Sequence, residues 1–147
     1  MLIRRANIAD SADILNWRND QHSRNMFFRP DKVKDVDHEK WFEDALQSRT
    51  VQLFIGEDHG EKVGICRFEL QAPDDKTEVS INLNPGHRGK GLSKKLLDGA
   101  MTEYLAHNNV DLVARVKKEN SPSIRLFKSA GFYVEAENKV ELVLLFS

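Results

Sequence analysis

Residues 78 to 93 read Glu78-Val79-Ser80-Ile81-Asn82-Leu83-Asn84-Pro85-Gly86-His87-Arg88-Gly89-Lys90-Gly91-Leu92-Ser93. The first six residues alternate between polar and apolar side chains, which predicts a strand with one apolar face. A broad apolar stripe then predicts a helix from Leu92 to His107. Between them, three glycines let a ligand approach the backbone, and the free NH groups at the helix start attract phosphate. Arg88 and Lys90 add positive charge, so we expect the loop to bind a pyrophosphate; an ordinary basic turn is the alternative.

The residues after this stretch predict a strand, helix and strand unit. Residues 110–116 alternate between apolar and polar, and we expect their strand to lie parallel to residues 78–83 with a right-handed connection. A short helix should occupy residues 121–131, with a proline near its start and a glycine just past its end. Residues 132–134 and 140–146 should close the sheet as a hairpin.

The residues before the stretch predict elements of both kinds. Helices are expected over residues 8–17, capped by Asn7 and packed through Ile8, Ala12 and Leu15, and over residues 36–47, capped by Asp35. An irregular segment, residues 19–34, should separate them. Strands are expected over residues 2–5, 51–55 and 63–70, the last two as a hairpin, and a turn at Pro73, Asp74 and Asp75.

Composition limits the class of protein. The chain has 147 residues, 40% hydrophobic and 31% charged, which predicts a single domain over residues 1–147. A formal net charge of −1 provides no overall field for nucleic acid or a membrane, so neither partner is expected. A single cysteine, Cys66, and the lack of any stretch of about 18 apolar residues favour a cytoplasmic setting. The five histidines are scattered and expected to be solvated, so no metal is predicted.

Two common phosphate-binding loops do not fit the sequence. A nucleoside triphosphatase loop needs Ser or Thr after Gly-Lys, whereas Gly91 follows Gly89-Lys90. A dinucleotide-binding loop needs a third glycine where this chain has Lys94. A generic nucleotide-binding protein that takes up ATP or NAD remains an alternative.

The segment Arg88-Gly89-Lys90-Gly91-Leu92-Ser93 resembles the Arg-x-x-Gly-x-Gly or Ala loop of the GNAT acetyltransferase superfamily, with Ser93 in the last place. Residues 120–132, which begin with Asn120 and end in Gly131-Phe132, resemble the second segment of that family. The resemblance covers nearly the whole chain. It implies the GNAT α/β (α+β) fold, a mixed and mostly antiparallel sheet that contains one parallel βαβ unit and is flanked by helices. It also implies acetyl-CoA as cosubstrate and a small-molecule primary amine that attacks the thioester directly, and it allows a homodimer.

The same resemblance implies roles for individual residues. Backbone NH groups near Leu83 and Asn84 would polarise the thioester carbonyl, and Asn120 would bond the cofactor arm or only cap its helix. Phe127 stands where many members have a proton-donating tyrosine; it can pack beside the cofactor, but Tyr133 or water would have to supply the proton. The NH groups expected to bind the pyrophosphate belong to Arg88, Gly89, Lys90, Gly91, Leu92 and Ser93.

Glu78 is the first candidate for the base, because some family members place a carboxylate at this point on the polar face of the strand. Ser80, Asn82 and Asn84 share that face and could orient the substrate or a water molecule. The alternative is a strand-end glutamate without a catalytic role. Tyr104 lies in the apolar stripe of the long helix and should be core.

Substrate selection in the family falls to the first two helices and the segment between them. Side chains able to stack a ring and bind phosphates gather there: Trp17, Arg18, Arg24, Met26, Phe27, Phe28 and Arg29. With the run His38-Glu39-Lys40-Trp41-Phe42, this segment resembles the nucleotide-linked 4-amino-sugar acetyltransferases of pseudaminic acid synthesis and, less closely, the ribosomal-protein N-terminal acetyltransferases. The tryptophans could instead be core and the arginines solvated. A coenzyme A-binding module without catalysis is an alternative of another class.

Overall fold

The computed structural model describes residues 1–71 and 75–147. Pro73 and Asp74 of the predicted turn therefore lie outside the described residues. In chain order the elements are β1 (Leu2–Arg5), the 3-10 turn η1 (Ile8–Asp10), α1 (Ser11–Asn19), α2 (Gln21–Met26), α3 (Asp35–Gln47), β2 (Val51–Asp58), β3 (Glu61–Gln71), β4 (Lys76–Leu83), η2 (Pro85–His87), α4 (Leu92–Leu105), β5 (Asp111–Lys117), α5 (Ser121–Ser129), β6 (Tyr133–Glu137) and β7 (Glu141–Phe146).

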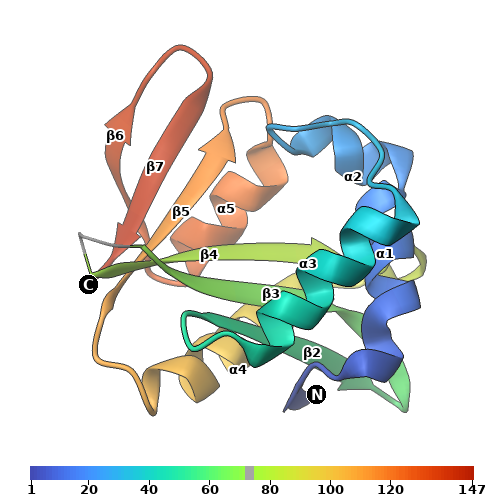
Figure 1. Ribbon diagram of the computed structural model, residues 1–147. Coiled ribbons are helices and arrows are strands. Elements are labelled where there is room, and N and C mark those ends of the chain that lie inside the picture. Colours follow the sequence, from blue (N-terminus) through green and yellow to red (C-terminus); the bar gives the residue numbers. More distant parts are fainter. Residues whose placement is uncertain (72–74) are drawn as a thin grey trace.

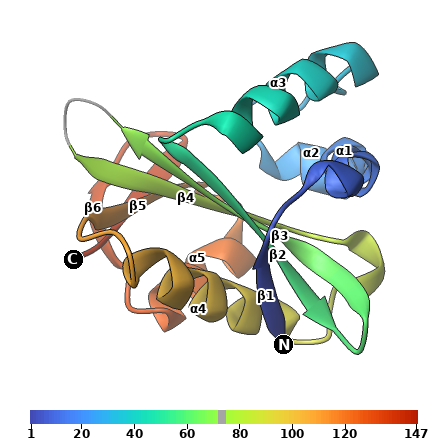
Figure 2. The same cartoon turned by 60° about the horizontal axis from the view of Figure 1, so that its bottom comes forward.

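The described strands form one seven-stranded sheet in the order β1-β2-β3-β4-β5-β7-β6. Strands β4 and β5 are parallel, and each other neighbouring pair in this order is antiparallel. Helices α1, α2 and α3 lie on one face of the sheet, and α4 and α5 lie on the other (Figures 1 and 2). The predicted α/β (α+β) architecture, mostly antiparallel with one parallel unit, is confirmed.

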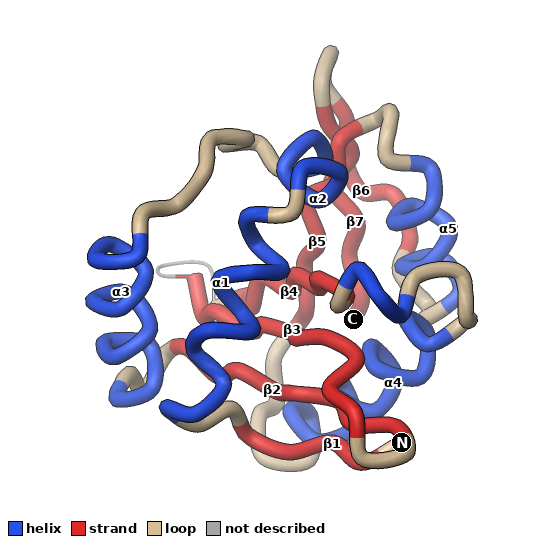
Figure 3. Tube along the Cα trace, turned by 90° about the vertical axis from the view of Figure 1, so that its right-hand side faces the viewer, coloured by secondary structure: helices blue, strands red, loops and turns tan. Residues whose placement is uncertain are grey.

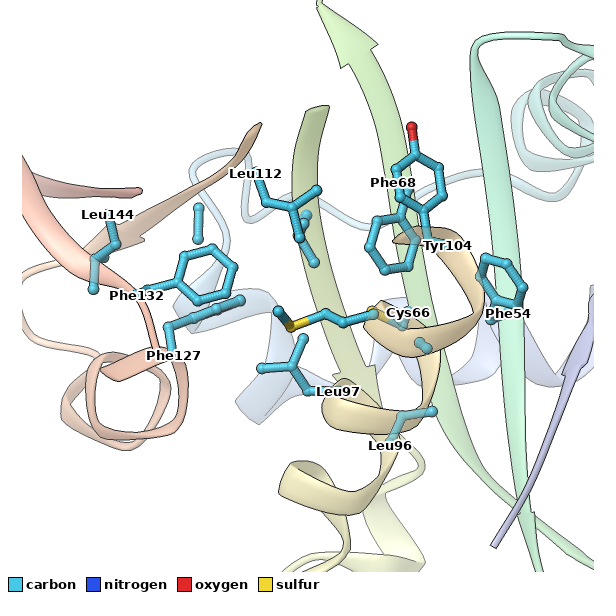
Figure 4. Close-up of a cluster of buried hydrophobic side chains, with 14 of the residues drawn as sticks. Phe54, Cys66, Phe68, Leu96, Leu97, Tyr104, Leu112, Phe127, Phe132 and Leu144 are labelled. Atoms are coloured by element: carbon cyan, nitrogen blue, oxygen red, sulfur yellow. The ribbon is translucent and has the colours of Figure 1, made fainter. Parts of the chain in front are cut away.

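The larger core lies between the sheet and helices α4 and α5. Helix α4 buries the stripe that the sequence predicts, including Leu96, Leu97 and Tyr104, against apolar side chains of the sheet (Figure 4). The Tyr104 ring stacks on Phe68 with centroids 4.3 Å apart, and its hydroxyl lies 2.9 Å from the Thr77 hydroxyl. Tyr104 is therefore a core residue, as expected, and its polar end is satisfied.

The first helix packs through a different face from the one expected. Asn7 does form a cap, accepting a hydrogen bond from the Ala9 NH, but the turn it starts is a 3-10 turn. The α-helix begins only at Ser11, and it buries Ile14 and Trp17. Ile8 is 62% exposed, so the predicted packing face of Ile8, Ala12 and Leu15 is wrong. The short 3-10 turn changes the angular phase of the residues that follow it.

Two further expectations for this region are corrected. The segment predicted to be irregular, residues 19–34, contains α2, whose first turn is capped by Asp20. Helix α3 begins at Asp35 itself, so Asp35 is its first residue and not its cap. None of the helices in the described residues has the length and apolar character needed to cross a lipid bilayer.

Two histidines are buried, although all five were expected to be solvated. The His87 Nε2 lies 3.1 Å from Glu61 Oε2, which joins the turn after β4 to the start of β3. His38 is 4% exposed, and its Nε2 donates to the Ser11 carbonyl at 3.0 Å. Burial lowers the pKa of His38, which favours the neutral ring.

Asp10 is a buried carboxylate that joins β1 and α1 to β3. Its two oxygens accept hydrogen bonds from Arg4 Nη1 and Nη2, both at 2.8 Å, and Lys62 Nζ lies 2.8 Å from Oδ1. The Asn7 NH donates to Oδ2 at 2.8 Å as well. Burial by itself raises the pKa of Asp10, but these donors more than offset burial, and the pKa lies well below its ordinary value.

We expect Asp10→Asn to lower the free energy of unfolding by about 3–5 kcal/mol, because Arg4 and Lys62 would lose their buried anion. Urea unfolding at neutral pH measures this. The matched control is Asp98→Asn, which removes an exposed pair with Lys94 and should cost less than about 1 kcal/mol.

The pH dependence of unfolding tests the same carboxylate. Because the folded-state pKa is depressed, its stabilisation is complete above the unfolded value of about 3.9 and is lost as the pH falls below that value. Wild type should therefore lose more stability than Asp10→Asn between about pH 5 and pH 2. Equal losses in the two proteins would show that Asp10 is not a stabilising anion.

Candidate active site

Strands β4 and β5 separate in the middle of the sheet and leave an opening. Among the described residues, their pairing is confined to Lys76 with Asp111, Thr77 with Leu112 and Glu78 with Val113. Both strands continue beyond these pairs, β4 to Leu83 and β5 to Lys117, and they diverge in Figure 1. The second half of β4 therefore has one edge paired with β3 and one edge facing the opening.

The β3 pairing shows which NH groups of β4 face the opening. The Asn84 NH donates to the Val63 carbonyl at 2.8 Å, so it points toward β3. Because hydrogen bonds alternate along an antiparallel ladder, the NH groups of Ile81 and Leu83 point the other way, toward β5. Of the two NH groups expected to polarise a carbonyl, the Leu83 NH is placed to do so, while the Asn84 NH is already bonded. Ile81 supplies a candidate that the sequence reasoning missed.

The loop after β4 is shaped to hold an anion at the start of α4. Gly89 and Gly91 have φ values of +75° and +71°, and a Cβ at either position would meet nothing within 4 Å, so the space beside them is open. Gly91 is the N-cap of α4, and among the described residues no side chain caps the first turn. Lys90 is exposed at the same place. Free NH groups, the helix dipole and a lysine therefore converge where the pyrophosphate is expected.

Two residues of this segment are committed elsewhere. The side chain of Asn84 accepts from the Gly86 NH at 3.1 Å and donates to the Lys62 carbonyl at 3.0 Å, which shapes the turn. The Arg88 guanidinium donates to the Asp20 carboxylate and to the Ser23 hydroxyl, the latter at 2.7 Å. Both acceptors belong to the start of α2. The Nη2 of Arg88 is therefore directed to α2, and its backbone NH donates to the Pro85 carbonyl at 3.4 Å.

The residues expected on the β5 side of the opening lie at the start and inside of α5. The Asn120 side chain accepts a hydrogen bond from the Ser123 NH at 3.3 Å, so Asn120 caps α5. It follows β5 directly, and the carboxyl ends of parallel strands share one edge of the sheet, so it stands opposite the loop after β4. Phe127 is buried and packs edge-on against Phe132, with centroids 5.1 Å apart (Figure 4). Its ring is part of the core.

The two expected catalytic side chains are not close to each other. Glu78 is half-buried at the last pair before the opening, where its Oε2 accepts from Gln71 Nε2 at 3.4 Å. Tyr133 pairs with Leu145 in the outermost strand β6, and Leu145 pairs with Val113. Two buried residues thus stand between Tyr133 and Glu78 in one row, and three strand spacings of about 4.8 Å put the two backbones roughly 14 Å apart. Tyr133 is 50% exposed and shares a face of the sheet with Glu78, but it lies three strands away.

A pocket of about 320 Å³ lies on the face of β4 that the first helices cover. It is lined by residues of α1, of α3 and of the segment that joins α2 to α3. Its floor includes Ser80, Ile81 and Asn82, which belong to the part of β4 that has left β5. The lining residues are Ile14, Arg18, Phe27, Val33, Asp37, His38, Trp41, Ile65, Arg67, Ser80, Ile81 and Asn82. The pocket and the opening therefore share one stretch of β4.

Only some of the residues expected to bind the substrate line this pocket. Arg18, Phe27 and Asn82 line it. Trp17 is 4% exposed and belongs to the smaller core under α1 and α3, and Phe28 is 47% exposed and outside the pocket. Sequence reasoning missed His38, Arg67 and other lining residues. For His38 a signal was present, because it stands four residues before the buried Phe42 and so shares its helix face.

Arg18 lines the pocket, and the charge of Arg24, which is not among the lining residues, acts on it. Arg18 Nη2 donates to the Arg29 carbonyl at 2.6 Å, and its guanidinium lies 4.2 Å from the centroid of Phe27. Within the described part of the chain, Arg18 Nη1 and Arg24 Nε are buried without a hydrogen-bond partner. Burial and the nearby Arg24 lower the pKa of Arg18. Both nitrogens therefore lack the hydrogen bond that buried donors normally make.

Several known proteins are similar to this chain. A model of the acetyltransferase (GNAT) domain matches residues 1–133. The chain is 30% identical over 141 residues to the L-methionine sulfoximine/L-methionine sulfone acetyltransferase of Salmonella typhimurium, a match that covers 93% of this chain and 82% of that protein. It is 30% identical over 142 residues to the L-amino acid N-acyltransferase MnaT of Escherichia coli, with the same coverage.

Solved structures agree with this relationship. The YncA protein of Salmonella typhimurium, solved with its cofactor acetyl-CoA, has a TM-score of 0.81 and 27% identity, and the match covers 99% of this chain and 91% of that chain. The spermidine N-acetyltransferase of Vibrio cholerae, solved with CoA and spermine, has a TM-score of 0.83 at 18% identity and covers 98% and 92% of the two chains. The second likeness is one of fold.

We expect Gly91→Asp to abolish measurable binding of acetyl-CoA in calorimetry, because it places a negative charge beside the expected pyrophosphate. Gly91→Asn is the matched control, since Asn has nearly the same shape and both residues tolerate a positive φ. The Asn variant should bind more weakly than wild type but far better than the Asp variant. Equal affinities in a folded Asp variant and in wild type would refute this loop as the pyrophosphate site.

Proposed function

Because the chain belongs to the acetyltransferase (GNAT) family, we propose that it transfers the acetyl group of acetyl-CoA to the primary amine of a compact molecule that also carries an acidic group. The observation that carries the acidic group is the pair of buried donors Arg18 Nη1 and Arg24 Nε, which have no partner among the described residues; the first belongs to a residue that lines the pocket. The relatives that act on L-methionine sulfoximine and on L-amino acids support the same class of acceptor.

The positions of the residues suggest how the reaction proceeds. The NH groups of Ile81 and Leu83, which face the opening, polarise the thioester carbonyl as its oxygen gains charge. Ser80 and Asn82 hold the amine on the pocket side of the same strand. Glu78, at the last pair before the opening, takes the amine proton directly or through water. The thiol released has an unperturbed pKa of about 8.5, so the thiolate leaves without a tyrosine acid at the place of Phe127.

The nucleotide-linked amino sugar expected from the sequence is the competing acceptor. Arg18 and Arg24 could bind a diphosphate, but a pocket of about 320 Å³ is at the low end of the range of roughly 300–1,000 Å³ for ligand sites. Phe28, which was expected to stack the base, lies outside the pocket. The relatives described above are not named for nucleotide sugars or for ribosomal proteins. A compact acid therefore has more support than a nucleotide sugar or a protein N-terminus.

Polyamines have less support from the electrostatics of the pocket. Spermidine N(1)-acetyltransferase of Escherichia coli is 29% identical over 98 residues, covering 65% of this chain and 53% of that enzyme. A polycation would meet the charges of Arg18 and the nearby Arg24, since Arg67 is paired with Glu69 and Asp37 is the one carboxylate among the lining residues. These positive charges would repel a positively charged polyamine. A coenzyme A-binding module without catalysis would give no thiol release with any amine.

We expect Glu78→Gln to lower kcat about 100-fold or more while the Kd for acetyl-CoA stays within about twofold, because the carboxylate acts on the amine. Thiol release and calorimetry measure the two quantities. Glu69→Gln is the matched control: Glu69 stands opposite Glu78 on β3, but its carboxylate is paired with Arg67. A Glu78→Gln rate and pH profile like those of wild type would assign proton removal to bulk water.

We expect wild type to acetylate an L-amino acid faster than its carboxamide, because the amide has no charge for Arg18 and Arg24. Arg24→Gln should raise KM for the acid by about 10- to 100-fold, the loss of one charge-assisted hydrogen bond, and leave KM for the amide nearly unchanged. Arg29→Gln is the control, because Arg29 is exposed and contributes its carbonyl to Arg18. A wild-type preference for the UDP-amino sugar, or equal use of acid and amide, would overturn the acidic acceptor.

A further inference from the structure

We propose that Arg88, although it belongs to the cofactor loop, is a positioning residue for the acceptor: its side chain holds α2, and through α2 the acceptor-side residues Arg24 and Phe27. This inference rests on the proposed function, because it assigns the pocket beside Arg18 to the acceptor. It separates the backbone of Arg88, which belongs to the phosphate loop, from its guanidinium.

One nitrogen of Arg88 contacts both groups that start α2. Nη2 donates to the Asp20 carboxylate and to the Ser23 hydroxyl, 68 and 65 residues away in the chain. Asp20 also accepts from the Ser23 NH at 3.0 Å and so caps α2. The hydrogen bond from Arg88 is the largest cause of the lowered pKa of Asp20, which keeps the cap ionised. The guanidinium and the cap therefore form one unit.

Helix α2 depends on such polar anchors because it has little apolar packing of its own. It is six residues long, whereas isolated helices shorter than about 12–15 residues are marginal. Its only buried side chain, with all six residues described, is Ser23, which is the residue that Arg88 contacts. At the other end, Lys117 Nζ donates to the Asn25 carbonyl at 3.3 Å. Losing Arg88 would free the start of the helix.

The two anchors come from the two sides of the opening. Arg88 follows β4, and Lys117 is the last residue of β5. Contacts from the loop after β4 and from the end of β5 therefore both reach α2, which lies next to α1 (Figure 3).

Arg88 also offsets an unfavourable arrangement that α2 imposes. Arg24 is close enough to Arg18 to lower its pKa, so the two guanidinium groups repel each other. Arg24 directly follows Ser23, so the contact of Arg88 with Ser23 fixes the helix turn that carries Arg24. Phe27, the next residue after α2, lies under the Arg18 guanidinium. Without the anchor, repulsion would move α2 outward and disperse the pair.

Lys90 leaves Arg88 free for this task. It stands two residues further along the loop, it is exposed, and it is close to the open N-terminus of α4. The two cations of the loop therefore have different roles: Lys90 attracts the pyrophosphate, and Arg88 holds α2 with its acceptor-side residues.

The test compares Arg88→Gln with Lys90→Gln in the full chain. Arg88→Gln should raise KM for the acceptor at least 10-fold and change the calorimetric Kd for acetyl-CoA less than twofold, and Lys90→Gln should do the reverse. Asp20→Asn should reproduce Arg88→Gln, and the double variant should be no worse than either single variant, because the two residues act as a unit. A rise in the Kd for acetyl-CoA with unchanged KM for the acceptor in Arg88→Gln would overturn the proposal.

A second measurement does not depend on turnover. Hydrogen exchange of the backbone amides of residues 21–26 should be at least 10-fold faster in Arg88→Gln than in wild type, and it should be unchanged in Lys90→Gln. The melting temperature of the domain should be the same in all three proteins. If wild type acetylates no amine, the proposed function fails, but the exchange rates still show whether Arg88 holds α2 in place. Equal exchange of residues 21–26 in wild type and Arg88→Gln would show that Arg88 does not hold α2.

Discussion

The short pairing of β4 with β5 is the constraint on which the site depends. Three residue pairs hold the two parallel strands together, and beyond Glu78 and Val113 they separate. Separation leaves the NH groups of Ile81 and Leu83 without strand partners, and unpaired backbone donors inside a fold are costly unless something bonds them. A thioester carbonyl can serve as that partner. The same divergence brings the loops after both strands to one edge, where Asn120 and the glycine-rich loop stand opposite each other.

The two sides of this opening are built from different kinds of contact. On the cofactor side, α4 is fixed by a continuous apolar core, and the same helix presents its uncapped N-terminus to the glycine-rich loop. On the acceptor side, α2 is held by hydrogen bonds from Arg88 and Lys117, with Ser23 as its one buried residue. Helix α4 is thus fixed by apolar burial, whereas α2 is fixed by a few polar contacts.

What could be predicted from the sequence follows from which contacts are local. The stripe of α4 and the parallel β5 were predicted correctly, because hydrophobic periodicity acts within a few residues. Helix α2 was missed because its support comes from Arg88, more than 60 residues away. The side of α1 was wrong because one 3-10 turn after Asn7 shifts the phase of the helix. Tyr133 could not be placed from the sequence, because β7 lies between β5 and β6 in the sheet. This strand order is set by long-range pairing and does not follow the order of the strands in the chain.

Two clusters of charged residues in this chain differ in whether their buried charges are paired. Around Asp10, three carboxylates (Asp10, Asp13 and Glu57) and two cations (Arg4 and Lys62) pair with one another, and among the described residues none of these side chains has a buried polar atom without a partner, so the cluster serves stability. Around Arg18 and Arg24, two cations meet without a carboxylate between them, and one NH of each remains buried and unbonded within the described chain. Keeping such a pair costs folding free energy. An anion bound there would relieve both the repulsion and the unmet donors, and this is the physical basis for proposing an acceptor with an acidic group.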